Sequence, residues 1–259
     1  MHFLSIEPRE ARGFSSTVPF FGSLTATPTT AMLHPALEER TWVYELDRVD
    51  RLVRYAALDS PFTVDLPLDP MHGTVGVAPA GGEAFASITP GAHGGNMDTP
   101  ELRAGTTAYF GVNVPGAQLA IGDGHCRQGE GEVCGTAVEA AMRTVVVVDL
   151  IKGAGTPWPR LESDEFLMST GSARPLEDAY RVSQHDLVTW AAELTGWDTL
   201  DAYQLVSQAG LAPTGNVVDT NYTMVAKLAK RYLGREGVVV ADGVHDRLRE
   251  TGAAYLSQR

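Results

Sequence analysis

The sequence predicts a predominantly β protein of the α+β class, with a β-sandwich or barrel-like body and a helical C-terminal part. Short β-branched and aromatic runs alternate with turns over residues 1–172, and the whole chain of 259 residues holds 27 Gly and 15 Pro. Apolar residues at helical spacing begin only after Arg174. We therefore divide the chain into a β-rich body that carries the candidate site, residues 1–172, and a mixed helical subdomain integrated with it, residues 173–259.

The expected strands of the body are short and are bounded by turn residues. Residues 41–46 alternate and are rich in β-forming side chains, and residues 61–67 form a similar run between two prolines. Residues 106–114 end at the turn formed by Pro115 and Gly116. Residues 143–151 include four consecutive valines and give the strongest strand prediction. Three shorter runs complete the set, at residues 18–24, 74–78 and 118–121.

Helices are expected only in the C-terminal part. The first covers residues 176–194, directly after Pro175, and Gly196 is its stop signal. Asp198 is a suitable N-cap for a second helix that Gly210 ends. Residues 223–233 and 243–256 are predicted to form two further helices.

The charge balance narrows the classes of function. The chain has 20 Lys and Arg against 32 Asp and Glu, a net charge of -12, which is unsuited to a nucleic-acid partner. It has no run of 18 apolar residues, and residues 1–7 lack the pattern of a signal peptide. Two cysteines are too few for a disulfide framework. We expect a cytoplasmic protein that has no membrane partner and handles a neutral or cationic small molecule.

Ligand-type side chains concentrate in two glycine-rich segments, residues 90–99 and 122–136. Three pairs there are spaced i and i+2: Asn96 with Asp98, Asp123 with His125, and Glu130 with Glu132. Such pairs share a face in extended backbone, so the three pairs can converge on one point. Carboxylates with imidazole suit zinc, manganese or a similar divalent metal. The remaining histidines lack comparable neighbours and are interpreted as structural: His2, His34, His72, His185 and His245.

Three kinds of function are compatible with these segments. A bound metal would polarise a carbonyl and lower the pKa of its water, and a nearby carboxylate would move the proton to a leaving amine. Cys134 or Cys126 is an alternative nucleophile, with a neighbouring Glu or His as base. The third possibility is a metal-binding or ligand-binding β protein without catalysis. The G-x-S-x-G, G-x-G-x-x-G and P-loop motifs are absent.

Several segments resemble the acetamidase/formamidase family. The sharpest are residues 71–80, 93–98, 115–117, 122–139, 201–207 and 216–219. The resemblance implies hydrolysis of a small aliphatic amide, of the formamide or acetamide type, to a carboxylic acid and ammonia. It also implies a β-rich homo-oligomer, expected to be a dimer or a trimer, and a bound divalent metal for which zinc is the first choice.

The same resemblance assigns roles to individual residues. It implies Asp98, Asp123 and His125 as metal ligands, with His93 and Asn96 as second choices. Glu132 is then the general base and Glu130 its alternative, while the amide of Asn96 or Gln128 stabilises the oxyanion. These residues therefore form the expected site: His93, Asn96, Asp98, Asp123, His125, Gln128, Glu130 and Glu132.

The start of the chain departs from the family pattern. Residues 3–13 resemble the middle of the family's N-terminal half, before which members usually carry several dozen further residues. We therefore expect the chain to be short at its N-terminus, with sheet edges and apolar faces left uncovered there.

Overall fold

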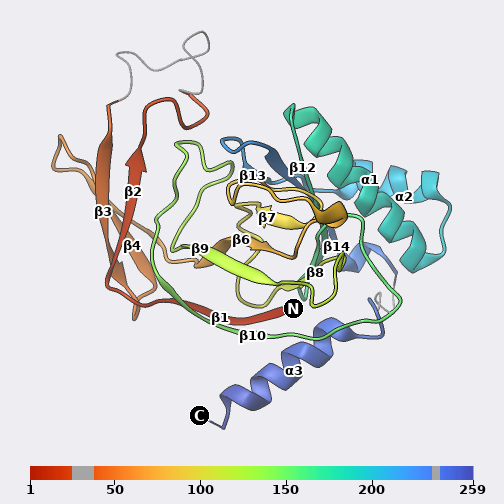
Figure 1. Cartoon of the computed structure of the whole chain (residues 1–259). Helices are drawn as coiled ribbons and strands as arrows, with labels where there is room; N and C mark the ends of the chain where they lie inside the picture. Colours follow the sequence, from red (N-terminus) through yellow and green to blue (C-terminus); the bar gives the residue numbers. More distant parts are fainter. Residues whose placement is uncertain (25–37, 235–239, 259) are drawn as a thin grey trace.

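The computed structural model describes residues 1–24, 38–234 and 240–258. Across these ranges the chain forms sheets of seven, four and three strands together with three α-helices, and none of the sheets closes into a barrel. The prediction of a predominantly β protein with a helical C-terminal part is confirmed (Figure 1). His34 lies outside the described residues.

The seven-stranded sheet forms the larger layer of the body. All its neighbouring strands pair antiparallel, including β1 and β10, which lie far apart in the sequence (Figure 1). Its strands, in spatial order, are β10 (Met142–Val147), β1 (His2–Pro8), β8 (Thr107–Tyr109), β11 (Arg160–Glu162), β12 (Phe166–Ala173), β14 (Tyr222–Ala229) and β13 (Thr214–Asn216).

The two smaller sheets have different positions. The three-stranded sheet places β6 (Met71–Gly76) between β7 (Gly94–Asn96) and β9 (Ala120–His125). The four-stranded sheet stands at the end of the molecule opposite α1 and α2 (Figure 1). Its strands are β2 (Arg12–Thr17), β3 (Arg40–Asp47), β4 (Leu52–Ala56) and β5 (Thr63–Pro67).

The main core lies between the seven-stranded and three-stranded sheets, as expected for a sandwich. Phe3 of β1 and Leu161 of β11 are fully buried there, against Val75 of β6. Met97, just after β7, completes the contact.

The helices begin and end where the sequence predicts. Gly196, in the left-handed conformation with a φ of 72°, ends α1 (Leu176–Thr195). Asp198 accepts a hydrogen bond from the Leu200 amide at 2.8 Å and so caps α2 (Thr199–Ala209). A Cβ on Gly171 of β12 would lie 2.4 Å from the Ala179 carbonyl, so α1 packs directly on the sheet. The remaining helix is α3 (Val244–Leu256), which contacts β1 and β10.

The predicted helix over residues 223–233 is wrong. This segment forms β14, followed by a 3-10 turn at Lys230–Tyr232. Ala226 and Leu228 pack beneath the helices, whereas Val225 faces the sandwich core. A strand buried on both faces reads as a continuous apolar run, which periodicity does not separate from a helix. Because β13 and β14 share a sheet with β12, residues on both sides of position 172 build one layer, and the division there stays a prediction.

Several predicted strands are shorter than their apolar runs. The run at 106–114 forms β8 only over Thr107–Tyr109, and the run at 143–151 ends as a strand at Val147. Residues 18–24 form turns instead of the predicted strand, with the Phe21 amide bonded to the Val18 carbonyl at 3.1 Å. Apolar composition therefore extends beyond the hydrogen-bonded ladders at these places.

His2 is expected to make the fold sensitive to acid. Its ring is buried with Nδ1 2.9 Å from Thr107 Oγ1, and burial lowers the pKa of His2 from 6.5 to about 4. The unfolded chain takes up this proton near pH 6.5, so the free energy of unfolding falls as the pH drops from 6.5 towards 4. His2→Asn should remove part of that fall, of order 2 kcal/mol, in denaturant unfolding measured at pH 7 and pH 4.5.

The exposed His185 on α1 provides the matched control. His185→Asn should keep the pH dependence of the unsubstituted protein. An identical pH dependence for His2→Asn would show that His2 is not the source of the acid sensitivity.

Candidate metal centre

The candidate centre is built on the three-stranded sheet and the loops that leave it. Thr74 of β6 pairs with Asn96 at the end of β7, and Met71 pairs with His125 at the end of β9. The antiparallel pairing brings two chain segments to opposite sides of β6. Asp98 follows one of these strands and Asp123 lies within the other, so both carboxylates reach the same region.

His125 is the central side chain of the site, with 1% of its surface exposed. Its Nδ1 lies 2.8 Å from Gln128 Oε1. Its Nε2 makes no hydrogen bond, although it lies 3.2 Å from an oxygen of Asp123, 3.2 Å from one of Glu139 and 4.0 Å from one of Glu132. Nδ1 is therefore hydrogen-bonded to Gln128, and Nε2 faces carboxylates.

The two carboxylate oxygens of Asp98 also differ, because only one of them accepts a hydrogen bond. The side chain is 1% exposed, and its Oδ2 accepts a hydrogen bond from Asn96 Nδ2 at 2.6 Å. Its Oδ1 has no hydrogen-bond partner. A buried polar atom without a partner costs about 1–3 kcal/mol, and native proteins retain few of them. Asp98 Oδ1 and His125 Nε2 are thus two unpaired ligand atoms in one buried place.

The surrounding donor set fits a divalent cation. Ligand atoms of Asp98, His125 and Glu132 all lie within 4.8 Å of one another, and the same holds for Asp123, His125 and Glu139. Imidazole and carboxylates are a ligand set that zinc accepts. A third acidic grouping around His245 lies elsewhere and includes Asp164, which is paired with Arg249.

Three acids of the centre have left-handed backbone, as do six other non-glycine residues in the part of the chain that the structure describes. Asp98, Asp123 and Glu132 all adopt the left-handed region, with φ values of 45°, 57° and 48°. Such a conformation costs about 1–3 kcal/mol for a non-glycine residue and is retained mainly at functional sites. Gly73 on β6 leaves the space that the carboxylates occupy, because a Cβ there would lie 2.2 Å from Asp98 Oδ1 and 2.3 Å from Asp123 Oδ2.

Several acids lie around one imidazole, and their burial and mutual charges shift the pKa values of the site. Burial raises the pKa of Glu132 to about 8. Burial and the charge of Glu132 raise the pKa of Asp98 well above its usual range. Burial opposes the ionisation of both Asp123 and His125, but the contact between them has the larger effect. It lowers the pKa of Asp123, and together with the contact to Glu139 it raises the pKa of His125. This excess of negative groups favours a bound cation.

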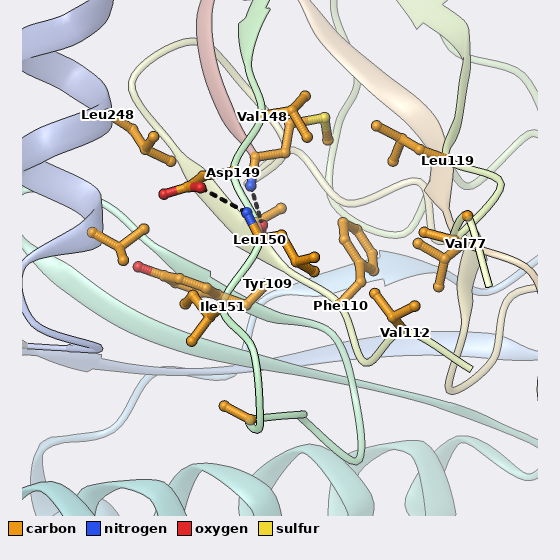
Figure 2. Close-up of a pocket in the computed structure, with 16 residues that line it drawn as sticks. Val77, Tyr109, Phe110, Val112, Leu119, Val148, Asp149, Leu150, Ile151 and Leu248 are labelled. Atoms are coloured by element: carbon orange, nitrogen blue, oxygen red, sulfur yellow. Dashed lines mark hydrogen bonds between the residues drawn. The ribbon is translucent and has the colours of Figure 1, made fainter. Parts of the chain in front are cut away.

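An apolar cavity of about 590 Å³ lies apart from this centre, since no residue of the centre lines it (Figure 2). Its wall includes Phe110, Leu119 and Leu150. Its one acidic residue, Asp149, accepts hydrogen bonds from the Leu150 amide and from Arg247. The cavity therefore lacks the unpaired ligand atoms that mark the candidate centre.

Comparison with known proteins identifies the family. The model of the acetamidase/formamidase family matches residues 12–220. The chain belongs to the acetamidase/formamidase family. The matched range includes every residue of the candidate centre, so its acids and histidine lie within the family's shared region.

Solved structures of the family share the fold. The acetamidase from Yersinia enterocolitica is 43% identical with a TM-score of 0.81, and the match covers 90% of this chain and 69% of that one. The acetamidase from Bacillus halodurans is 30% identical with a TM-score of 0.76, and the match covers 89% of this chain and 72% of that one.

Curated relatives match over shorter stretches. The formamidase of Methylophilus methylotrophus is 41% identical over 75 residues, which is 28% of this chain and 18% of that protein. The acetamidase of Mycolicibacterium smegmatis is 35% identical over 107 residues, 38% of this chain and 26% of that protein. The chain thus matches about a quarter or less of each of these two acetamidase/formamidase proteins.

The structure brings four residues of the expected site together around one point: Asp98, Asp123, His125 and Glu132. Two others lie apart from it. His93 stacks on Phe85 with a ring separation of 5.3 Å, and Glu130 accepts a hydrogen bond from the Thr214 amide at 2.7 Å. Neither contact leaves these side chains facing the unpaired atoms.

The two amides expected to stabilise an oxyanion are already engaged. Asn96 Nδ2 donates to Asp98 and, at 2.8 Å, to Asp219, while its Oδ1 accepts from Thr74. Gln128 Nε2 donates to the carbonyls of Asp98 and Gly215 at 2.5 and 3.0 Å. The described contacts therefore oppose the predicted oxyanion role of both amides and fit a role in holding the ligands.

Two acids of the centre are not among the residues expected from the sequence. Asp219 is buried and accepts a hydrogen bond from Asn96, which lies 123 positions earlier in the sequence. Glu139 lies 3.2 Å from His125 Nε2. Both lie in segments that carry the family resemblance, residues 216–219 and 122–139. Neither belongs to one of the pairs at i and i+2, so spacing alone does not select them.

The cysteines show no arrangement for nucleophilic catalysis. Cys126 is fully buried in the cluster that includes Leu46 and Val138, and burial raises the pKa of its thiol to about 12. The Cys134 thiol donates to the Thr136 carbonyl at 3.2 Å. A thiolate nucleophile needs a base within hydrogen-bonding distance, and the contacts described for these two thiols supply none.

Proposed function

We propose that this protein hydrolyses a small aliphatic amide, of the formamide or acetamide type, to a carboxylic acid and ammonia. The observation that carries the proposal is the pair of unpaired buried atoms, Asp98 Oδ1 and His125 Nε2, next to the buried carboxyl group of Glu132. Membership of the acetamidase/formamidase family supports amide bonds as the target.

Asp98, Asp123 and His125 are the residues that we propose to hold a divalent cation, with zinc as the first choice and Glu139 as a further carboxylate. Such a cation supplies a Lewis acid that polarises the amide carbonyl and lowers the pKa of a water molecule. Asn96 and Gln128 fix the other atoms of Asp98 and His125, so the two unpaired atoms keep their positions.

Glu132 is the proposed general base. It accepts a proton as the water oxygen forms a bond to the carbonyl carbon, and it returns that proton to the nitrogen as the C–N bond breaks and ammonia leaves. Burial raises the pKa of Glu132 to about 8, so its carboxyl group takes up a proton more readily than that of an exposed glutamate. Its carboxyl oxygen lies 4.0 Å from His125 Nε2, on the side of the unpaired atoms.

Metal removal is expected to abolish this activity. The protein should release ammonia from formamide, acetamide or another short amide, and stripping by a chelator should lower the rate at least about 100-fold, since a Lewis acid contributes several kcal/mol. Added zinc should restore the rate. The measurement is ammonia release over an amide panel, with metal content followed by mass spectrometry.

The alternatives give different outcomes. Full activity of metal-free protein would contradict the metal mechanism, and loss of activity on alkylation but not on chelation would favour Cys134. Metal-dependent thermal stability without ammonia release from any amide would indicate a binding protein instead.

The expected partners and location also stay predictions. Across the described residues no helix is long and apolar enough to cross a membrane. We propose a homo-oligomer, either a dimer or a trimer, because large apolar side chains such as Leu150 and Phe20 are strongly exposed. The cytoplasmic location and the lack of a nucleic-acid partner are proposed from the sequence alone.

A further inference from the structure

Gln128 occupies a position from which it contacts three separate segments of the centre. It is 7% exposed, and its side chain reaches His125, the Asp98 carbonyl and the Gly215 carbonyl. Both carbonyls are acceptors only, so the NH₂ group of the amide must face them. The Oε1 atom therefore faces His125 Nδ1 at 2.8 Å, and because Oε1 only accepts, Nδ1 must carry the hydrogen.

We infer that Gln128 is a positioning residue that fixes His125 as a ligand through Nε2. In the neutral ring that binds a metal, a hydrogen held on Nδ1 leaves the lone pair on Nε2, which is the atom without a hydrogen-bond partner. The inference rests on the proposed function, because it assigns Gln128 to the site that would hold the cation. Gln128 does not contact substrate in this role, since all its polar groups are engaged within the protein.

Gln128 also couples the imidazole to the backbone of a second ligand. Its Nε2 donates to the carbonyl of Asp98, whose left-handed backbone, with a φ of 45°, directs the carboxylate. The same atom holds Gly215, next to the buried Asn216. One side chain thus sets the orientation of His125 and the place of Asp98, which predicts a large effect on metal affinity.

The test compares zinc affinity among three variants. Gln128→Met keeps the size of the side chain but removes the acceptor and both donors, and it should weaken zinc binding about 10–100-fold in chelator competition. Gln128→Glu keeps an acceptor for Nδ1–H and should retain more affinity than Gln128→Met. Gln204→Met, at an exposed position of α2, is the matched control and should bind zinc like the unsubstituted protein.

A second measurement starts from the unsubstituted protein, so its main outcome does not require a variant to fold. In the zinc-loaded protein, ¹⁵N NMR should show His125 with a hydrogen on Nδ1 and with Nε2 as the coordinating atom. Gln128→Glu should keep this signature, and Gln128→Met should lose the slow exchange of the Nδ1 hydrogen. Coordination through Nδ1 would overturn the inference even if Gln128→Met failed to fold.

Different results would contradict the positioning role of Gln128 and the proposed metal centre. Undiminished zinc affinity of folded Gln128→Met, beside an unsubstituted protein that binds zinc, would overturn the positioning role alone. An unsubstituted protein that takes up no zinc would overturn both the proposed metal centre and this role.

Discussion

Glu132→Gln is expected to lower kcat for amide hydrolysis by about 10²–10⁴-fold, the usual contribution of a general acid-base group. The Gln side chain has the same shape but does not accept the proton of the attacking water. The carboxyl group is 7% exposed and burial raises its pKa to about 8, so a neutral side chain should be accommodated without loss of the fold. Ammonia release under saturating substrate measures the effect, and thermal unfolding checks the fold.

Glu130→Gln is the matched control for this change. Glu130 is two positions away and exposed, and it accepts a hydrogen bond from the Thr214 amide that a Gln oxygen also accepts. It should therefore retain most of its activity. Equal losses in the two variants would point to disruption of the loop, and full activity of Glu132→Gln would remove Glu132 from the mechanism.

Gly73→Ala is expected to lower kcat/KM about 100-fold, although it removes no charged group. Displacing reacting groups by about 1 Å is enough to lower a rate by this factor. The added Cβ would lie 2.2 Å from Asp98 Oδ1 and 2.3 Å from Asp123 Oδ2, so both carboxylates must move. The variant should also lose zinc affinity in chelator competition. Its β6 strand lies in the middle of the sheet, which limits how far the backbone yields.

Gly122→Ala controls for the same substitution in the same sheet. Gly122 lies on β9 opposite Thr74, and nothing lies within 4 Å of a Cβ built on it. Its activity should stay within a few fold of that of the unsubstituted protein. A fully active Gly73→Ala, or an equal loss in Gly122→Ala, would show that the space at Gly73 does not determine the position of the carboxylates.

Local signals in the sequence account for much of the fold. The end of α1 at Gly196 and the start of α2 at Asp198 depend on single residues whose backbone or side chain satisfies a helix end, so they are readable without tertiary contacts. Alternation likewise identifies β3 (Arg40–Asp47), in which Trp42, Tyr44 and Leu46 are partly or fully buried while the positions between them are exposed.

The errors arise where burial depends on the rest of the molecule. Residues 223–229 are buried from both sides by α1, α2 and the opposite sheet, and nothing within the segment distinguishes that from a buried helix. The centre shows the same limit. Asp123 and His125 are two positions apart, so their spacing in the sequence already indicates that they share a face. Asp219 is brought to the site only by the tertiary fold.

The hydrogen bond from Asn96 to Asp219 joins residues 123 positions apart and has a consequence for how the protein reaches its final state. Contacts this distant form late, because the chain entropy of closing them is lost before any bond rewards it. In the unfolded chain, Asp98 and Asp219 are therefore far from the candidate ligands within residues 123–139. A metal ion that joins these segments in the folded state would therefore add its binding free energy to the stability of that state.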